Sequence, residues 1–324
     1  MIKKLSRILT GTLSLVLAGQ IMFYGNETHN TISYAETVEE VSDETLSKET
    51  SEYIDQYGEY IGDPALEAYV SKKQELAEKL YQAMISENDN LVYQYQTEMQ
   101  MMEFEALGTA QQSVELTKGV KALTSPPPPS SYTISNFNQY SQLYSNYCGP
   151  ATAYMILKAK GVSSISQSSL ANGDLKVNVY GETPWYISNG NSFSEFPMFN
   201  ALNNAQGSKY YIPSPLGNAG SNPLSVDKCK SYIVSCTSNG NGVALCGTSK
   251  ASNSHASHMP GYTTAYDVDH WVACYGYTSN GNNVKIADPV AGCSAIGWSS
   301  GVSATYSITA EKCQAFIAPR GMLW

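Results

Sequence analysis

Basic residues are scarce in this chain of 324 residues. It carries 19 lysines and arginines against 28 aspartates and glutamates, which gives a formal net charge of −9. Nucleic-acid binding depends on a basic face that neutralises phosphates and releases their counterions. Nothing in the sequence supplies such a face, so we expect no nucleic-acid partner.

A long apolar run is also missing. A mostly apolar stretch covers residues 8–23, but it contains Thr, Ser, Gly and Gln and is short for a membrane span. Lys3, Lys4 and Arg7 precede it, which is typical of a secretory signal. Small residues at 33 and 35 favour cleavage there, and 16–18 is a weaker site. We predict a signal peptide over residues 1–35 and a secreted, extracellular or cell-surface protein, with an uncleaved anchor as the alternative.

Acidic residues are concentrated in residues 36–125. This segment holds 19 acidic residues against six lysines, whereas the chain beyond Pro126 holds eight against ten basic residues. Asp63 and Pro64 look like the cap and first position of a helix. Apolar residues then recur at helical spacing in two runs, at 66–84 and 92–102. The segment is therefore predicted to be helical.

Four consecutive prolines at 126–129 follow this segment. Such a run forms a stiff polyproline spacer, so residues 126–131 are predicted to be a linker and residues 132–324 a separate domain. The acidic segment then has two interpretations. It is a pro-region that binds the domain through complementary charge, or it is a solvated spacer or stalk.

The domain combines helical and strand patterns and is predicted to be α+β. Its clearest helix follows Cys148, and others are expected near 197–204 and 225–237. Pro150 suits the first helical position, and Gly161 suits the end of the helix. Strand patterns at 270–277 and 284–288 flank an Asn-Gly turn, which predicts an antiparallel hairpin.

Cys148 is the candidate nucleophile, because the positive end of a helix dipole favours a thiolate. The hairpin places His270 and Asp288 near the same end, where the carboxylate can orient the imidazole that takes the thiol proton. Gln142 is the candidate oxyanion donor, together with the Cys148 backbone N–H. Each residue also has an ordinary structural explanation, and the combination in this order carries the hypothesis.

The cysteines and histidines outside this group give weaker signals. Seven cysteines leave six besides Cys148, which allow fifteen pairings if disulfides form. Cys274, in the middle of a strand, suits a buried thiol. His255 and His258 lie in a polar loop without a cysteine pair at zinc spacing, so we expect neither a metal nor a cofactor.

These motifs carry a resemblance to a known family. Gln142, Tyr-Cys-Gly-Pro-Ala at 147–151, His-Trp-Val at 270–272 and Ala-Asp-Pro at 287–289 resemble the papain-like cysteine peptidases of the bacteriocin-processing, double-glycine leader type. The chain more closely resembles their free-standing, secreted bacterial relatives, and the resemblance covers about residue 133 to the C-terminus. The resemblance implies a papain-like α+β fold with the nucleophile helix packed on an antiparallel sheet.

The resemblance also implies roles for four residues. Cys148 is the nucleophile, His270 the general base and acid, Asp288 its orienter and Gln142 the oxyanion donor. The transporter-linked members carry membrane spans and an ATPase, and no P-loop pattern occurs here, so specificity for a Gly-Gly leader does not transfer.

The leading hypothesis is a secreted thiol protease that acts on a peptide or protein substrate and processes its own N-terminal segment near Pro126. A cell-wall peptide hydrolase or a transpeptidase is the nearest alternative, although the chain has no Asp-Cys-Ser-Gly block and no repeated wall-binding module. A non-catalytic secreted binding protein on the same fold is the other alternative.

Overall fold

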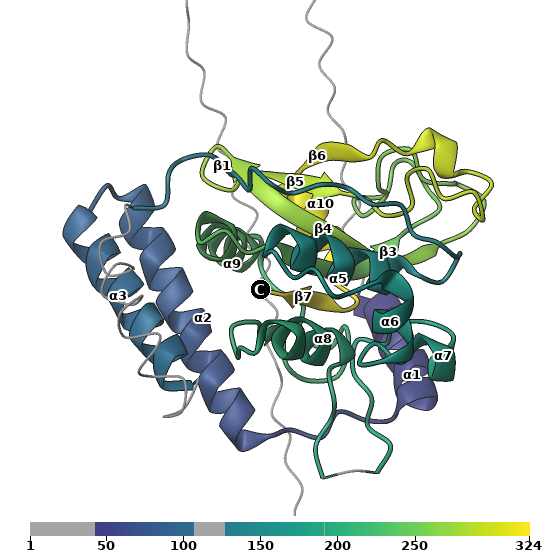
Figure 1. The fold of residues 1–324 in the computed structure, drawn as a ribbon, viewed down its shortest axis with the longest axis horizontal. Coiled ribbons are helices and arrows are strands. Elements are labelled where there is room, and N and C mark those ends of the chain that lie inside the picture. Colours follow the sequence, from purple (N-terminus) through teal and green to yellow (C-terminus); the bar gives the residue numbers. More distant parts are fainter. Residues whose placement is uncertain (1–42, 107–126, 191) are drawn as a thin grey trace, which may run out of the picture. The chain divides into compact units, whose positions relative to one another are not determined.

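The computed structural model describes residues 43–106, 127–190 and 192–324 (Figure 1). The predicted signal peptide over 1–35, its cleavage sites and Pro126 lie outside the described residues, as do residues 36–42 and 107–125 of the acidic segment. In the described ranges, no helix is both long and apolar enough to cross a membrane.

The acidic segment forms helices in its described part, as predicted. They are α1 (Asp43–Tyr57), α2 (Pro64–Ile85) and α3 (Asp89–Ala106). Asp63 caps α2 by accepting hydrogen bonds from the backbone N–H groups of Ala65 and Leu66, so the predicted start is confirmed. The helices α2 and α3 lie side by side, and α2 also packs against α9 (Val226–Ser238).

Lys73 of α2 anchors this helix pair to the rest of the fold. Its side chain is fully buried, and its Nζ lies 3.1 Å from a carboxylate oxygen of Glu103 on α3. The same ammonium group donates to the backbone carbonyl of Tyr210 and lies 3.8 Å from the centroid of the Tyr210 ring. Because every partner comes from another element, this one charge connects α2, α3 and the domain.

We expect Lys73→Met to lower the free energy of unfolding by about 3 kcal/mol, because it leaves Glu103 partly buried without its cation. Lys72→Met is the matched control. Lys72 lies one position earlier on α2 and pairs with Glu75 where both side chains are about half exposed, so its loss costs less than about 1 kcal/mol. Urea unfolding of both variants measures the difference, and equal losses would contradict the anchoring role.

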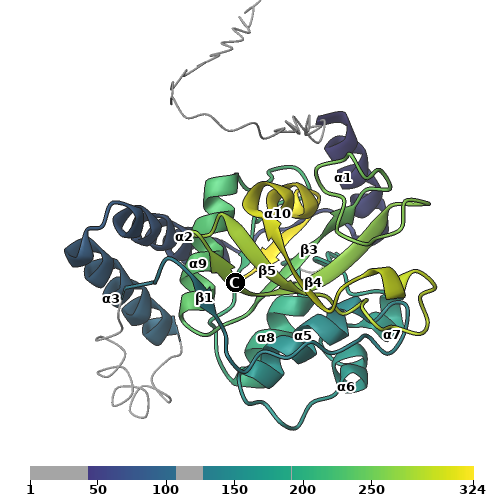
Figure 2. The same cartoon turned by 90° about the horizontal axis from the view of Figure 1, so that it is seen from above.

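The domain is built on an antiparallel sheet (Figure 2). Among the described residues its path is β2-β7-β3-β4-β5-β6. Strand β1 pairs with β4 on the same edge as β3, beyond the end of β3. The strands are β1 (Tyr132–Thr133), β2 (Pro213–Ser214), β3 (Val243–Ser249), β4 (Val268–Thr278), β5 (Asn283–Ala287), β6 (Thr305–Thr309) and β7 (Gly321–Leu323). Strands β4 and β5 form the predicted antiparallel hairpin, so that prediction is confirmed.

Helices cover both faces of the sheet. In Figure 2, α5 (Cys148–Ala159) and α8 (Pro197–Gln206) lie on one side of it and α10 (Ala310–Ile317) on the other. The predicted helices at 148, 197 and 225 are thus confirmed within one or two residues. The shorter elements are α6 (Gln167–Asn172), α7 (Val177–Tyr180) and η1 (Ser299–Gly301). The α+β class, with the Cys148 helix packed on an antiparallel sheet, is confirmed.

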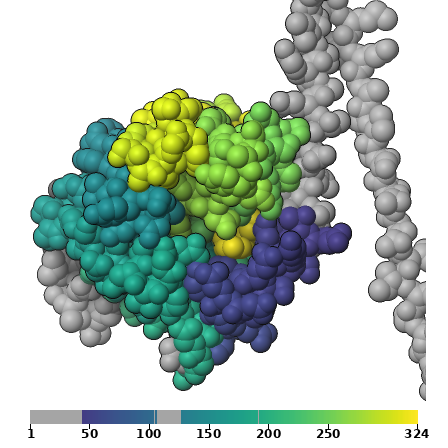
Figure 3. All heavy atoms as spheres, turned by 90° about the vertical axis from the view of Figure 1, so that its right-hand side faces the viewer, coloured from purple at the N-terminus to yellow at the C-terminus, as the bar shows by residue number. Residues whose placement is uncertain are grey.

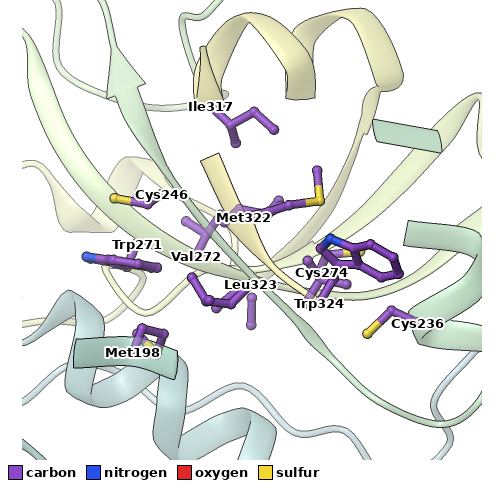
Figure 4. Packing of buried hydrophobic residues seen from close by; sticks show 14 of the residues in the cluster. Met198, Cys236, Cys246, Trp271, Val272, Cys274, Ile317, Met322, Leu323 and Trp324 are labelled. Carbon is purple, nitrogen blue, oxygen red and sulfur yellow. The ribbon is translucent and has the colours of Figure 1, made fainter. Parts of the chain in front are cut away.

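The core lies between these layers (Figure 4). Strand β4 contributes Trp271 and Val272. Leu323 of β7 lies near Val272, and Trp324, which follows β7, lies near Cys274. The Trp324 ring stacks on Tyr232 of α9 with centroids 4.4 Å apart.

All seven cysteines are free thiols, and the six other than Cys148 are buried. The disulfides considered from the sequence are therefore not formed in this structure.

Candidate active site

Cys148 is the first residue of α5. The helix forms because Ala153, Ile156 and Leu157 give it a fully buried stripe against the sheet. The sequence predicted that this helix starts at Pro150, two residues after its observed start. Pro150 instead occupies the third position, which it tolerates because first-turn N–H groups have no partner within the helix. The half-buried thiol thus lies at the positive end of the helix dipole.

Gly149 brings a second segment close to the nucleophile. A Cβ added at this position would lie 2.2 Å from Oγ1 of Thr183, so any larger residue would push the two segments apart. The indole N–H of Trp271 on β4 donates to the Thr183 carbonyl at 2.9 Å and fixes that segment from the other side. The region around Thr183 therefore forms one wall of the site.

His270 and Asp288 are brought together by the β4–β5 hairpin. Nε2 of His270 lies 3.1 Å from Oδ1 of Asp288, and the two side chains are 4% and 0% exposed. Because Nε2 bonds to Asp288, the other ring nitrogen is left for the Cys148 thiol, which also forms a hydrogen bond with the ring. The structure thus assembles Cys148, His270 and Asp288 in one row, in which His270 and Asp288 are buried.

This row changes the protonation of the imidazole. Burial disfavours the charged ring, but the hydrogen bonds to Asp288 and Cys148 and the negative charge on both outweigh burial and raise the pKa of His270 to about 10. The raised pKa favours the imidazolium form of His270. A cation beside Cys148 favours the thiolate, which is the nucleophilic form.

Two tyrosines complete the surroundings of Asp288, and sequence reasoning missed both. The hydroxyl groups of Tyr262 and Tyr306 each donate to Oδ2 at 2.7 Å, and the Val290 N–H donates to Oδ1 at 3.0 Å. Burial would raise the pKa of Asp288, but the bonds to His270, Tyr306 and Tyr262 outweigh it and hold this pKa below its usual value. No sequence signal marks the tyrosines, which lie 26 and 18 residues from Asp288.

Gln142 lies in the segment that leads into α5 and is buried. Its backbone N–H donates to the Pro289 carbonyl at 2.7 Å, next to Asp288. Its side-chain Nε2 donates to the carbonyls of Tyr144 and Ser145 at 2.8 and 3.0 Å. Both amide hydrogens are thus committed to neighbouring backbone, so donation to an oxyanion requires the side chain to exchange one of these bonds.

A small cavity of about 30 Å³ opens at Cys148 and His270. Thr183, Trp185, Asp269 and Arg320 are among the residues that line it, and so is Tyr53 of α1. Trp185 and Trp271 also border this cavity, whereas the Trp298 indole donates to the Tyr266 hydroxyl.

His255 and His258 have local partners. His255 bonds to Ser257, and His258 lies 2.6 Å from the Lys250 carbonyl. Within the described residues, no group of three or more His, Cys, Asp or Glu side chains is arranged to hold a metal ion.

Comparisons with known proteins identify the family. Neither the curated proteins nor the solved structures give a match to this chain. Residues 133–309 match the family described as Peptidase_C39 like. Because this match spans more than half of the chain and includes Cys148, His270 and Asp288, the chain belongs to the Peptidase_C39-like family of papain-like cysteine peptidases.

Proposed function

We propose that the protein is a secreted cysteine peptidase that hydrolyses peptide bonds with Cys148 as nucleophile and His270 as general acid and base. One observation carries the proposal: the buried His270–Asp288 pair lies against a thiol at the start of a helix and beside a cavity. Structural cysteines have no need of an imidazolium that is itself held by a buried carboxylate.

The proposed reaction has two halves. The Cys148 thiolate attacks the carbonyl carbon of the substrate, and the C–N bond breaks as the His270 imidazolium gives its proton to the departing amine. Neutral His270 then takes a proton from water, whose oxygen attacks the thioester. The C–S bond breaks and releases the carboxylic acid and the Cys148 thiolate. His270 keeps the proton as the imidazolium, so the enzyme is unchanged after one turnover.

Asp288 and Gln142 support these steps. Asp288 keeps the imidazole in one orientation and stabilises its positive charge, while Tyr262 and Tyr306 keep Asp288 ionised and in place. The backbone N–H of Cys148 faces the oxyanion at the helix N-terminus. Gln142 adds a second donor once its amide leaves one of its two backbone carbonyls.

The proposal extends to the N-terminal segment. Export by residues 1–35 places the enzyme outside the cell, and the acidic segment 36–125 serves as a pro-region that binds the catalytic domain and is removed by self-processing near Pro126. Two features support this part: the opposite charge balance of the two parts, and the ion pair between Glu49 of α1 and Lys250 of the domain.

A peptide-library experiment tests the function. The full chain and its Cys148→Ala variant are incubated with a mixture of synthetic peptides and, separately, with peptidoglycan fragments, and new termini are mapped by mass spectrometry. We expect peptide cleavage by the unmodified chain alone. Equal cleavage by both chains, or cleavage of peptidoglycan fragments alone, would overturn the proposal.

A further inference from the structure

Helix α1 lies on the face of the molecule where the site opens. A hollow of about 1040 Å³ borders this helix, with Arg320 of the C-terminal region among its lining residues (Figure 3). The hollow shares Tyr53, Glu182, Asp269 and Arg320 with the small cavity at Cys148. The hollow and the small cavity therefore adjoin, and Tyr53 of α1 lines both of them.

Both the hydroxyl group and the ring of Tyr53 make specific contacts with the rest of the chain. Its hydroxyl donates to the Tyr186 carbonyl and accepts from the Tyr186 N–H, both at 2.9 Å. The Arg320 guanidinium lies 4.5 Å from the centroid of its ring, which is a cation–π contact. The Tyr186 ring packs on another side at 5.0 Å. The side chain is 4% exposed and so fills the pocket.

The pocket wall that holds this hydroxyl leads directly to the nucleophile. Tyr186 follows Thr183, Pro184 and Trp185, which line the cavity at Cys148. Tyr53 and Cys148 both line that cavity, so a side chain placed like Tyr53 lies next to the position where a scissile bond must sit.

Helix α1 is attached by polar contacts and by three buried side chains, Leu46, Tyr53 and Tyr57. Thr50 donates to the Ala219 carbonyl, Tyr57 donates to Glu182, and Lys250 pairs with Glu49. Because part of this attachment is polar, exchange of α1 for another ligand is feasible.

We propose that this pocket, formed by Tyr186, Arg320 and the wall at 183–185, binds an aromatic, tyrosine-like side chain of the substrate, and that Tyr53 is its intramolecular occupant. The inference rests on the proposed peptidase function. It names the substrate class as peptides with an aromatic residue next to the scissile bond, and it makes α1 a competitor for them.

The test compares the full chain with its Tyr53→Ala variant. Matched peptides carry Tyr, Phe, Ala or Asp at the first or second position before the cleaved bond. We expect Tyr53→Ala to raise kcat/KM for the tyrosine peptide about tenfold or more, chiefly through KM, because a competing occupant is gone. The order should be Tyr, then Phe, then Ala, with Asp last. An unchanged rate, or no preference for aromatic peptides, would overturn the proposal.

A second variant leaves Tyr53 in place. Gly58 joins α1 to α2 with φ of +82°, and an added Cβ would lie 2.2 Å from the Ser188 carbonyl oxygen, so Gly58→Ala must displace the end of α1. Gly190→Ala is the matched control, because Gly190 has a similar φ of +74° and no neighbour within 4 Å. We expect Gly58→Ala, and not Gly190→Ala, to reproduce the gain. If Tyr53→Ala fails to fold, this pair decides the question.

Failure of the peptidase function remains distinguishable from failure of this inference. Chloromethyl ketones bearing a tyrosine or an alanine side chain alkylate a cysteine without any peptide hydrolysis. Faster modification of Cys148 by the tyrosine reagent in Tyr53→Ala would support the pocket even if no peptide were cleaved. Equal rates for the two reagents would overturn the pocket whether or not peptides were cleaved.

Discussion

Replacing His270 with alanine is expected to lower kcat/KM for peptide cleavage by a factor on the order of 10⁴ or more. The ring supplies three things at once: the positive charge that favours the Cys148 thiolate, the proton for the departing amine, and the base for the attacking water. No other titratable group bonds to both Cys148 and Asp288 in the described part of the chain, so nothing replaces it.

Cys148→Ala should cause a loss of the same order, because the nucleophile and the base act as one unit. The double variant should therefore be little worse than either single variant. Cys229→Ala is the control, since this thiol is buried in α9 and lies outside the cavity. Initial rates on the best peptide are measured for these four variants and for the unmodified chain. Rates for His270→Ala within tenfold of the unmodified chain would contradict the assigned role.

The second large effect is a shift in pH dependence for Asp288→Asn. Activity requires the imidazolium, so its alkaline limb should follow the pKa of His270, which is about 10. Asparagine keeps the shape of aspartate but removes the negative charge. The alkaline limb should therefore fall by one unit or more toward the ordinary imidazole value of 6.5.

Stability should change with pH in the same variant. The pKa of His270 is higher in the folded chain than in the unfolded one, so its contribution is fully present below about pH 6.5 and is lost as the pH rises through about 10. Asp288→Asn removes much of this contribution, so its deficit in unfolding free energy should be larger at pH 6 than at pH 10.

Enzyme kinetics measured as a function of pH give the change in the alkaline limb, and urea unfolding at about pH 6 and pH 10 gives the change in stability. Asp227→Asn is the control, because this carboxylate is exposed on α9 and remote from the histidine. An alkaline limb unchanged by Asp288→Asn would show that the carboxylate does not set the charge of His270.

The parts of the site that the sequence predicts are those set by local geometry. The turn at Asn280-Gly281 adopts positive φ at both residues, and it pairs the two strands so that His270 and Asp288 meet. The start of the Cys148 helix follows from a buried stripe at helical spacing and is misplaced by only two residues. In each case the information lies within about twenty residues.

The parts that the sequence does not predict depend on contacts between distant segments. Tyr262 and Tyr306 reach Asp288 because the loop before β4 and the strand β6 converge on it. Tyr53 meets Tyr186 across 133 positions. The partners of Gln142 are local, but its amide orientation depends on how the loop closes before α5. None of these contacts has a periodicity or spacing that a single sequence could reveal.

The measurement that tests the central claim most directly is alkylation of Cys148. The unreduced full chain is treated briefly with iodoacetamide at about pH 6, where an ordinary thiol with a pKa of about 8.5 is almost entirely protonated and slow to react. The modified peptide is then identified by mass spectrometry. The Tyr53→Ala variant is labelled in parallel, so that shielding by α1 does not hide the thiol.

We predict rapid, single labelling at Cys148 that is lost in His270→Ala. Such a result would establish an activated thiolate that depends on the imidazolium. Labelling of Cys148 no faster than in the denatured chain, in both the unmodified chain and Tyr53→Ala, would contradict the peptidase account.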